Sequence, residues 1–265
     1  MKKAIPFTLL IILFAGAAWY SFMKTPDPIH EVPPPPIAPA LLDNLQQALP
    51  QPQIDSDVIF PESESEPVTP PEPLPVLIES DFEVTQALAD IADTDPIAEY
   101  LVMDQIISRA VASIDSLTSR RVPVHINPIR PAEGKFIVNS EGGKLVLGPK
   151  NFARYDGYVT LLQNMSTDSL MSFYRRYSPL FQQAWEENGG QGSFNDRLLE
   201  VIDDLLGAPD VAGPVYLTKY EAVYLFEVPE LEAMTAGQKT LVRMGSVNAS
   251  VVKEKLIEMR AELNP

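Results

Sequence analysis

The chain has 265 residues, no cysteine, two histidines and a formal net charge of −16. The lack of cysteine excludes disulfides, thiolate metal sites, cysteine nucleophiles and N-terminal lipoprotein attachment. Residues 79–265 hold 27 acidic side chains against 17 lysines and arginines, and because so acidic a domain repels phosphate backbones, we expect no nucleic acid partner.

An apolar span opens the chain. Residues 4–22 are 19 residues without a charge, just long enough to cross a bilayer as a helix. Lys2 and Lys3 before the span favour an N-terminus in the cytoplasm. The alternative is a cleaved secretory signal, because residues 15–17 match an A-x-A cleavage site. We predict a membrane anchor over residues 1–23, and both interpretations place the rest of the chain outside the inner membrane.

The next segment, residues 24–78, is dominated by proline and acid. It contains 15 of the 26 prolines, and nine acidic side chains against one lysine. Proline favours extended polyproline II and like charges repel each other. We therefore predict a disordered linker that holds the following domain, residues 79–265, away from the lipid surface.

A short leucine stripe interrupts this linker. Leu41, Leu42, Leu45 and Leu49 fall on one face of a helix predicted over residues 39–49. Such a stripe is typical of a short helix that docks into a groove on a partner. The alternatives are a transient helix and a helix that packs back on the chain's own folded domain.

The remaining domain has the pattern of a mainly helical fold. Periodicity and capping residues predict helices that cover about 80–92, 95–119, 149–164, 166–189, 193–207, 235–245 and 246 to near the C-terminus. Two β-rich pairs, 136–139 with 144–147 and 215–217 with 222–226, predict hairpins. The predicted fold class is a multi-helix bundle with one or two small β-hairpins, preceded by a transmembrane helix and a disordered linker.

Local signals predict how some of these helices begin and bend. Ser80 with Glu83, and Thr235 with Gln238, match the capping box, in which two side chains satisfy each other's exposed backbone amides. Pro179 lies inside the fourth predicted helix, and we expect it to kink that helix or to split it.

The chain has little that suggests a familiar catalytic site. His30 lies in the linker and His125 lies in a loop between prolines, which is too little for a zinc site or a histidine-based triad. The sequence has no G-x-S-x-G, no phosphate-binding glycine loop and no H-E-x-x-H. We therefore assign no catalytic residue, no cofactor and no metal ligand.

One acidic helix is the best chemical candidate. Asp196, Glu200 and Asp203 recur at helical spacing on one face, and Asn195 and Arg197 lie beside them in the sequence. Clustered carboxylates bind divalent cations or shift each other's pKa for acid–base catalysis. The alternative is a solvated acidic face, in which Asp196 lies at the positive end of the helix and Arg197 pairs with Glu200.

Basic and aromatic residues form a second candidate set. Arg154, Tyr155 and Asp156 are consecutive, and Arg175 and Arg176 lie in the next predicted helix. Arginine and tyrosine are enriched at protein interfaces, and arginine also binds carboxylates. The alternative is structural, with the two later arginines covering the flanks of their helix with aliphatic stems.

Four groups of motifs in this domain show a resemblance to a known family. They are Asn151-Phe-Ala-Arg-Tyr-Asp156, Tyr174-Arg-Arg-Tyr177 with Pro179-Leu180, Phe194-Asn-Asp-Arg-Leu198 through Val201-Ile-Asp203, and Ala236-Gly-Gln-Lys239 with Arg243-Met-Gly245. Together they resemble the domain of unknown function 3014 over about residues 79–263. The resemblance implies a proteobacterial inner-membrane protein with a single span, and it supplies no activity, cofactor or site.

These observations lead to three hypotheses for function. The first is a membrane-anchored periplasmic binding or scaffolding domain, held in the inner membrane by residues 4–22, that presents its helices to an envelope protein or a cell-wall component. The second is a cell-wall hydrolase that uses the acidic helix 194–206 with Arg154 or Arg175, whose side chains must then converge in a cleft. The third is a regulatory domain that senses a small ligand in an apolar pocket between helices.

Overall fold

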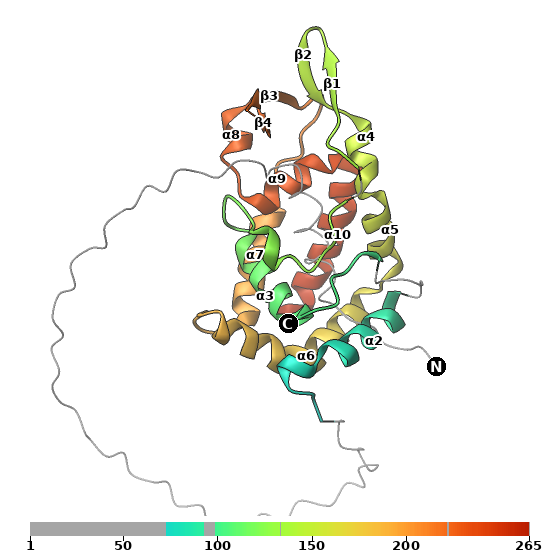
Figure 1. The fold of residues 1–265 in the computed structure, drawn as a ribbon, viewed down its shortest axis with the longest axis vertical. Helices are drawn as coiled ribbons and strands as arrows, with labels where there is room; N and C mark the ends of the chain where they lie inside the picture. Colours follow the sequence, from blue (N-terminus) through green and yellow to red (C-terminus); the bar gives the residue numbers. More distant parts are fainter. Residues whose placement is uncertain (1–72, 93–98, 133, 222, 265) are drawn as a thin grey trace, which may run out of the picture. The chain divides into compact units, whose positions relative to one another are not determined.

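The computed structural model describes residues 73–92, 99–132, 134–221 and 223–264. No helix in these ranges is long and apolar enough to cross a membrane. The predicted membrane span, the leucine stripe, most of the predicted linker and the predicted helix start at Asp95 lie outside the described residues. Within them the fold is mainly helical with a small antiparallel sheet at one end (Figure 1), as the sequence predicts.

The last helix of the chain lies at the centre of the bundle. Figure 1 shows α10 (Gly245–Leu263) between α5 (Asp156–Asn164) on one side and α3 (Ile106–Ser116) and α7 (Phe194–Leu206) on the other. The remaining helices are α2 (Asp81–Ala92), α4 (Pro149–Phe152), α6 (Thr167–Glu187), α8 (Pro229–Glu232) and α9 (Ala236–Arg243), with short 3-10 turns at Leu77–Glu79, Val124–Ile126 and Ala153–Tyr155. Contacts to α5, α6, α7 and α9 make α10 the element on which the bundle is assembled.

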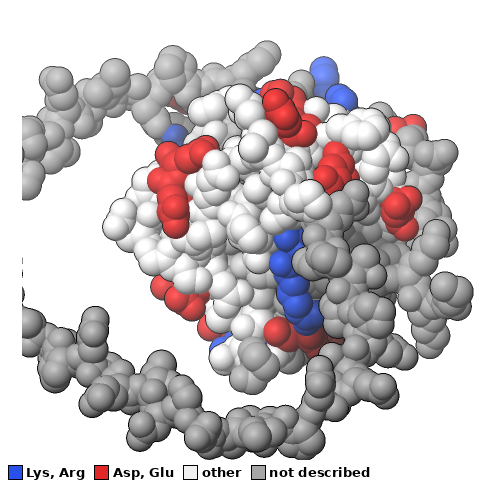
Figure 2. Space-filling model, turned by 90° about the horizontal axis from the view of Figure 1, so that it is seen from below, with Lys and Arg blue, Asp and Glu red and all other residues white. Residues whose placement is uncertain are grey.

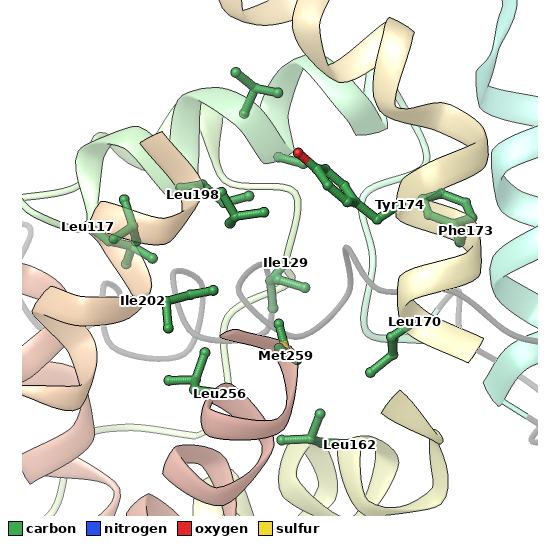
Figure 3. Close-up of a cluster of buried hydrophobic side chains, with 14 of the residues drawn as sticks. Leu117, Ile129, Leu162, Leu170, Phe173, Tyr174, Leu198, Ile202, Leu256 and Met259 are labelled. Carbon is green, nitrogen blue, oxygen red and sulfur yellow. The ribbon is translucent and has the colours of Figure 1, made fainter. Parts of the chain in front are cut away.

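The main hydrophobic core surrounds α10. Leu256 and Met259 of α10 meet Leu162 of α5, Leu170 of α6 and Ile202 of α7, and each of these side chains is at most 1% exposed (Figure 3). Burying an apolar side chain of this size stabilises a fold by about 1.5–3 kcal/mol relative to leaving it exposed. The helical spacing of these residues in the sequence therefore reflects one shared apolar interior.

Both predicted hairpins form, and they join into one four-stranded antiparallel sheet. The strands, in sheet order, are β1 (Val138–Glu141), β2 (Lys144–Leu147), β3 (Tyr216–Tyr220) and β4 (Val223–Phe226). β1 begins later than predicted, because Gly142 (φ 56°) and Gly143 (φ 83°) take the left-handed conformation of a two-residue turn. The pair Leu145–Leu217 joins the two hairpins.

One face of the sheet covers a second, smaller core. Leu147, Val215, Leu217 and Phe226 from the sheet side are buried together with Val242 of α9. This cluster fixes the sheet on α9, which leads directly into the central helix α10.

Helix α3 begins later than the sequence predicts, and its cap comes from another helix. Before Ile106 the chain is extended, and Leu101 pairs with Ile129 in an isolated β-bridge. Gln105, the N-cap residue, has a left-handed φ of 51° and makes no side-chain cap. Asp81 of α2 accepts hydrogen bonds from the backbone amides of Gln105 at 2.7 Å and Ile106 at 2.9 Å. These bonds satisfy amides that the first turn of a helix leaves without partners.

The capping box predicted at the start of α2 is wrong, although the helix forms. The Ser80 hydroxyl donates to the Leu77 carbonyl at 2.7 Å. Glu83 Oε1 accepts from the Tyr177 hydroxyl at 2.8 Å and from Arg176 at 3.2 Å. Partners from the neighbouring helix α6 therefore replace the local bonds that the motif predicts.

One of the two hydrogen bonds of the capping box predicted at α9 forms, and the other is replaced by a bond to α7. Thr235 Oγ1 accepts from the Gln238 amide at 3.2 Å, as predicted. The Gln238 side chain instead donates to the backbone carbonyl of Asp204 at 2.8 Å, and Thr235 also donates to the Asp204 carboxylate at 2.8 Å. The motif thus ties α9 to the end of α7.

The start of α9 meets the end of α3. The amides of Ala236 and Gly237 donate to the carbonyls of Ser119 at 2.7 Å and Leu117 at 2.9 Å. These bonds pair free amides at one helix end with free carbonyls at another. A Cβ at Gly237 would lie 2.4 Å from Leu205 Cδ2, so a larger residue there would have to displace this buried leucine of α7.

Helix α6 continues through Pro179 and does not split. A proline inside a helix leaves the carbonyl four residues earlier without its usual partner. Here that carbonyl belongs to Arg175, and the Ser178 hydroxyl donates to it at 3.0 Å. Ser166 caps the helix by accepting from the Ser169 amide, as predicted.

Replacing Asp81 by alanine is expected to lower the free energy of unfolding by about 1–2 kcal/mol, because two amides at the start of α3 lose their acceptor. Urea unfolding followed by circular dichroism measures this change. Asp90→Ala, at an exposed position of the same helix, is the matched control and should change the free energy by less than about 0.5 kcal/mol. Equal losses in the two variants would contradict the capping role.

Candidate functional site

Two of the sequence motifs come together at the start of α10. A Cβ on Gly245 (φ 81°) would lie 2.7 Å from Cγ of Phe152, so only glycine allows the ring to approach this closely. The Asn248 amide donates to the Phe152 carbonyl at 3.1 Å and to Asp156 Oδ1 at 3.0 Å. The segment around Phe152 is therefore held against the first turns of α10.

Asn151 fixes the other side of this junction. Its side chain is 1% exposed, accepts a hydrogen bond from the Ile137 amide at 2.9 Å and donates to the Ile137 carbonyl. The side-chain amide of Asn151 thus bonds to the backbone of Ile137 as a neighbouring strand would. These bonds hold the segment that leads into β1.

A buried charged cluster lies between the sheet and α9. Lys239 Nζ is 3.0 Å from Glu232 Oε1, while Glu232 Oε2 accepts from the Phe226 amide at 3.0 Å. The Arg243 guanidinium lies 4.9 Å from the centre of the Phe226 ring. Burial lowers the pKa of Lys239 and of Arg243, and the hydrogen bond with Glu232 opposes the shift of Lys239. Burial also raises the pKa of Tyr155, which the charge of Arg243 opposes.

A pocket of about 300 Å³ lies beside this junction, and we call it the α9–α10 pocket. Its wall combines Phe152, the loop between α7 and β3, the end of α9 and the first turns of α10. The lining residues are Phe152, Pro209, Asp210, Val211, Ala212, Gly213, Val215, Leu241, Val242, Gly245, Ser246 and Ala249. Most of this lining is apolar, and its volume is at the lower end of the range for small-molecule sites.

The charged side chain in the lining of the α9–α10 pocket is already ion-paired. Asp210 belongs to the lining, and its side chain is 82% exposed. Lys253 Nζ approaches it at 2.6 Å and also donates to the Ala208 carbonyl at 2.7 Å, and the lysine side chain is only 16% exposed. The lysine therefore holds the loop against α10 and points its charge into the protein.

The structure places the acidic-helix candidates on α7 and connects them to different neighbours. Arg197 donates to Asp115 Oδ1 at 2.8 Å, at the end of α3, and to Glu200 at 2.9 Å. Asp203 pairs with Arg260 of α10 at 2.5 Å. Asp196 is exposed in the first turn of the helix. Arg197 and Asp203 therefore join α7 to different helices, Glu200 pairs within α7, and the set does not converge on one cleft.

Asn195 takes part in the N-terminal cap of α7. The amide of Asn195 donates to the N-cap hydroxyl of Ser193 at 3.1 Å, as the capping pattern predicts.

Burial raises the pKa of the Tyr174 hydroxyl, and the nearby charge of Asp196 raises it further. Within the described ranges, no three histidine, cysteine or carboxylate side chains are grouped so that they could hold a metal ion.

The basic candidates are also dispersed. Arg154 donates to the carbonyls of Ala132 at 3.1 Å and Gly134 at 3.3 Å. Arg175 pairs with Glu262 of α10 at 2.6 Å, and Arg176 pairs with a carboxylate of α2. Asp156 accepts a hydrogen bond from Asn248 of α10 and does not belong to the lining of the α9–α10 pocket.

Carboxylates on the lower face of the molecule form separate groups. Figure 2 shows them apart from one another on the visible part of that face, with a short basic row between them and largely uncharged surface elsewhere. The visible part of this face therefore shows no continuous acidic surface.

Sequence reasoning missed the residues that build the pocket. Asp210 has no distinctive local pattern, so the sequence assigns it no role. A usable signal was present for Phe152 and Gly245, since both lie within the family motifs. Burial raises the pKa of the carboxyl of Asp204, the residue after Asp203 on α7, and the hydrogen bond from Thr235 opposes that shift.

Tyr177 is expected to make stability decrease at high pH. Burial, helped by its hydrogen bond to Glu83, raises its pKa from 10.0 to about 12. The native state then keeps a proton that the unfolded chain loses between these values, so the free energy of unfolding falls as pH rises through this window. Tyr177→Phe should show a shallower fall in urea unfolding than the wild-type protein. Tyr220→Phe, at an exposed position, is the control, and identical slopes in all three proteins would contradict the assignment.

Comparisons with known proteins identify a family. A search of curated proteins gave no match, and a search of solved structures also gave none. One family model, described as a protein of unknown function (DUF3014), matches residues 106–260, which is 155 of the 265 residues. The matched span contains all four groups of motifs, including those that meet at the α9–α10 pocket. This chain is therefore a member of the DUF3014 family, as the resemblance of its motifs predicts.

Proposed function

We propose that this protein is a membrane-anchored periplasmic binding or scaffolding protein that captures an envelope protein or a cell-wall component in the α9–α10 pocket. One observation supports this most directly: Phe152 and Gly245, from two separate family motifs, form one wall of the pocket. Of the side chains considered for hydrolysis, Asp203 and Arg175 bond to α10, Glu200 pairs with Arg197 of its own helix and Arg154 bonds to loop carbonyls, which gives the hydrolase hypothesis less support.

The proposed arrangement explains the organisation of the chain. A domain tied to a membrane by a long linker searches a limited volume, and its effective concentration near a target rises accordingly. A pocket of modest affinity is then sufficient for capture. The proposed anchor over residues 4–22 and the proposed linker supply this tether.

In-cell crosslinking of the full chain tests the proposal. We expect a discrete crosslinked product that the pocket variant Ala212→Trp loses and the control variant Ala261→Trp retains. Both alanines are exposed, so the bulky ring should affect folding little in either variant, and Ala212 lies in the pocket lining. The proposal fails if neither protein nor glycan is crosslinked above a control that contains residues 1–78 alone.

A ligand-sensing domain is the second candidate, favoured by the volume and apolar lining of the same pocket. Thermal unfolding of the full chain in the presence of cell-wall fragments tests it. Binding at a hundredfold excess over Kd would stabilise the native state by about 2.7 kcal/mol. Unchanged midpoints across the fragments would count against this candidate.

A further inference from the structure

We propose that residues 208–214, between α7 and β3, form a movable lid on the α9–α10 pocket and that Lys253 of α10 holds this lid shut. We call this segment the lid loop. The inference rests on the proposed function, because it adds a way to control access to the same pocket.

The lid loop forms one wall of the pocket. Pro209, Asp210, Val211, Ala212 and Gly213 belong to the lining. The remaining lining comes mainly from Phe152 and from the helices α9 and α10. A displacement of the loop would therefore widen the pocket while the helices stay in place.

The middle of the lid loop is loosely held between two fixed ends. Ala208 and Val215 are buried, and the Val215 carbonyl accepts from the Leu147 amide at 2.9 Å. Between them, no backbone hydrogen bond to another described residue holds residues 209–214. Gly213 has a φ of 98°, and a Cβ there would meet nothing within 4 Å, so no neighbour packs on this position. Few backbone bonds and an unpacked glycine are typical of a loop that opens locally.

Lys253 supplies the polar contacts that hold the loop closed. Its ammonium lies 2.6 Å from Asp210 Oδ1 and donates to the Ala208 carbonyl at 2.7 Å. Val211 adds an apolar contact, since its half-buried side chain packs against the smaller core. The Asp210 side chain is exposed, and an ion pair with a well-solvated partner is weak. The pair can therefore break and form again without loss of the fold.

Ala249 is the position that reports opening of the lid. It is a buried residue of the pocket lining, and it lies one helical turn before Lys253 on the same face of α10. The chain contains no cysteine, so Ala249→Cys introduces a single thiol. A small reagent reaches this thiol when the loop opens, and the labelling rate then follows the open fraction.

Thiol labelling of the full chain in neutral-lipid nanodiscs tests the inference, with N-ethylmaleimide as the probe and mass spectrometry as the readout. In the Ala249→Cys protein, Lys253→Met should raise the labelling rate about three- to tenfold, because the loop loses an ion pair and a hydrogen bond. Asp210→Asn should raise the rate less, because the bond from Lys253 to the Ala208 carbonyl remains. Lys255→Met is the matched control and should leave the rate unchanged. The Lys255 side chain is 15% exposed against 16% for Lys253, and it pairs with Glu258 of its own helix.

A buried thiol outside the pocket lining separates lid opening from unfolding of the whole domain. Ala184 is buried on α6, so Ala184→Cys reports unfolding of the main core. Lys253→Met should change its labelling rate less than that of Ala249→Cys. Equal rates at Ala249→Cys in the Lys253→Met and Lys255→Met proteins overturn the inference, and so does a rise by the same factor at both thiols.

The outcomes separate this inference from the proposed function. If labelling follows the expectation but Ala212→Trp leaves the in-cell crosslink intact, the lid stands and the proposed function fails. If Lys253→Met leaves the labelling rate unchanged but Ala212→Trp abolishes the crosslink, the pocket captures its partner with a fixed wall and the inference fails.

Discussion

Replacing Glu232 by alanine is expected to lower the free energy of unfolding by about 2–3 kcal/mol, because one carboxylate supports two buried groups. It accepts from the Phe226 amide at 3.0 Å and pairs with Lys239 at 3.0 Å. The Lys239 side chain is 6% exposed. Removal of the Glu232 carboxylate therefore leaves the lysine ammonium buried without this counter-charge. Urea unfolding at neutral pH measures the change.

Companion variants separate the charge from the packing. Lys239→Met is expected to stay within about 1 kcal/mol of the wild-type protein, since an apolar side chain of similar volume avoids the cost of burying charge. In the Glu232→Ala background it should restore part of the lost stability. Glu230→Ala, at an exposed position of the same helix α8, is the control, and a loss no larger in Glu232→Ala than in this control would contradict the argument.

The pH dependence of Glu232→Ala gives an independent check. Burial already lowers the pKa of Lys239 from 10.5, and Glu232 opposes that shift. Without Glu232 the pKa falls further, so the native state binds fewer protons than the unfolded chain over a wider range. The variant should therefore recover stability relative to the wild-type protein as pH rises from neutral toward 10.5.

Replacing Gly245 by alanine is expected to destabilise the fold by about 2–4 kcal/mol. The residue has a φ of 81°, which costs an L-amino acid energy, and its new Cβ would lie 2.7 Å from Cγ of Phe152. The ring must then move away from α10 and change the wall of the α9–α10 pocket. Thermal and urea unfolding measure the stability, and the in-cell crosslink measures the pocket.

A second glycine isolates the backbone part of this effect. Gly213 also has a positive φ, 98°, but a Cβ there meets nothing within 4 Å. Gly213→Ala should therefore cost only about 1–2 kcal/mol. Phe152→Ala combined with Gly245→Ala should cost less than the sum of the single changes, because the clash is absent. Similar losses for the two single glycine variants would show that the contact with Phe152 has little weight.

The sequence predicted those elements whose signals are local. Ser166, Ser193 and Thr235 each accept from an amide in the first turn of the following helix, within three residues of themselves. Such bonds depend on a few neighbouring residues, so a short motif is enough to specify them. The first hairpin was predicted for the same reason, because Gly142 and Gly143 specify their own turn.

Predictions failed where a distant residue supplied the partner. The cap of α3 comes from Asp81, which precedes Ile106 by 25 residues and lies on another helix. Glu83 bonds to Tyr177, 94 residues away, in place of its predicted local partner. Periodicity shows which face of a helix is polar, but it does not identify the residue across that face.

The candidate site was hidden from the sequence for the same physical reason. Helical spacing correctly placed Asp196, Glu200 and Asp203 on α7, but the bond from Asp203 to Arg260 spans 57 residues and uses that carboxylate in packing. The α9–α10 pocket is built from Phe152 together with residues from 209 to 249. It exists only once the sheet, α9 and α10 have come together.

The central position of α10 has a consequence for how the nascent chain matures. Because α10 follows α5, α6 and α7 in the chain, these helices can bury the faces that contact it only after residues 245–263 have been synthesised. Contacts between residues distant in the chain also close slowly. In a polypeptide released at Met244, α3 could already pack on α6 and α7, but the side chains that surround Leu256 and Met259 would stay exposed, so this part of the core is completed late.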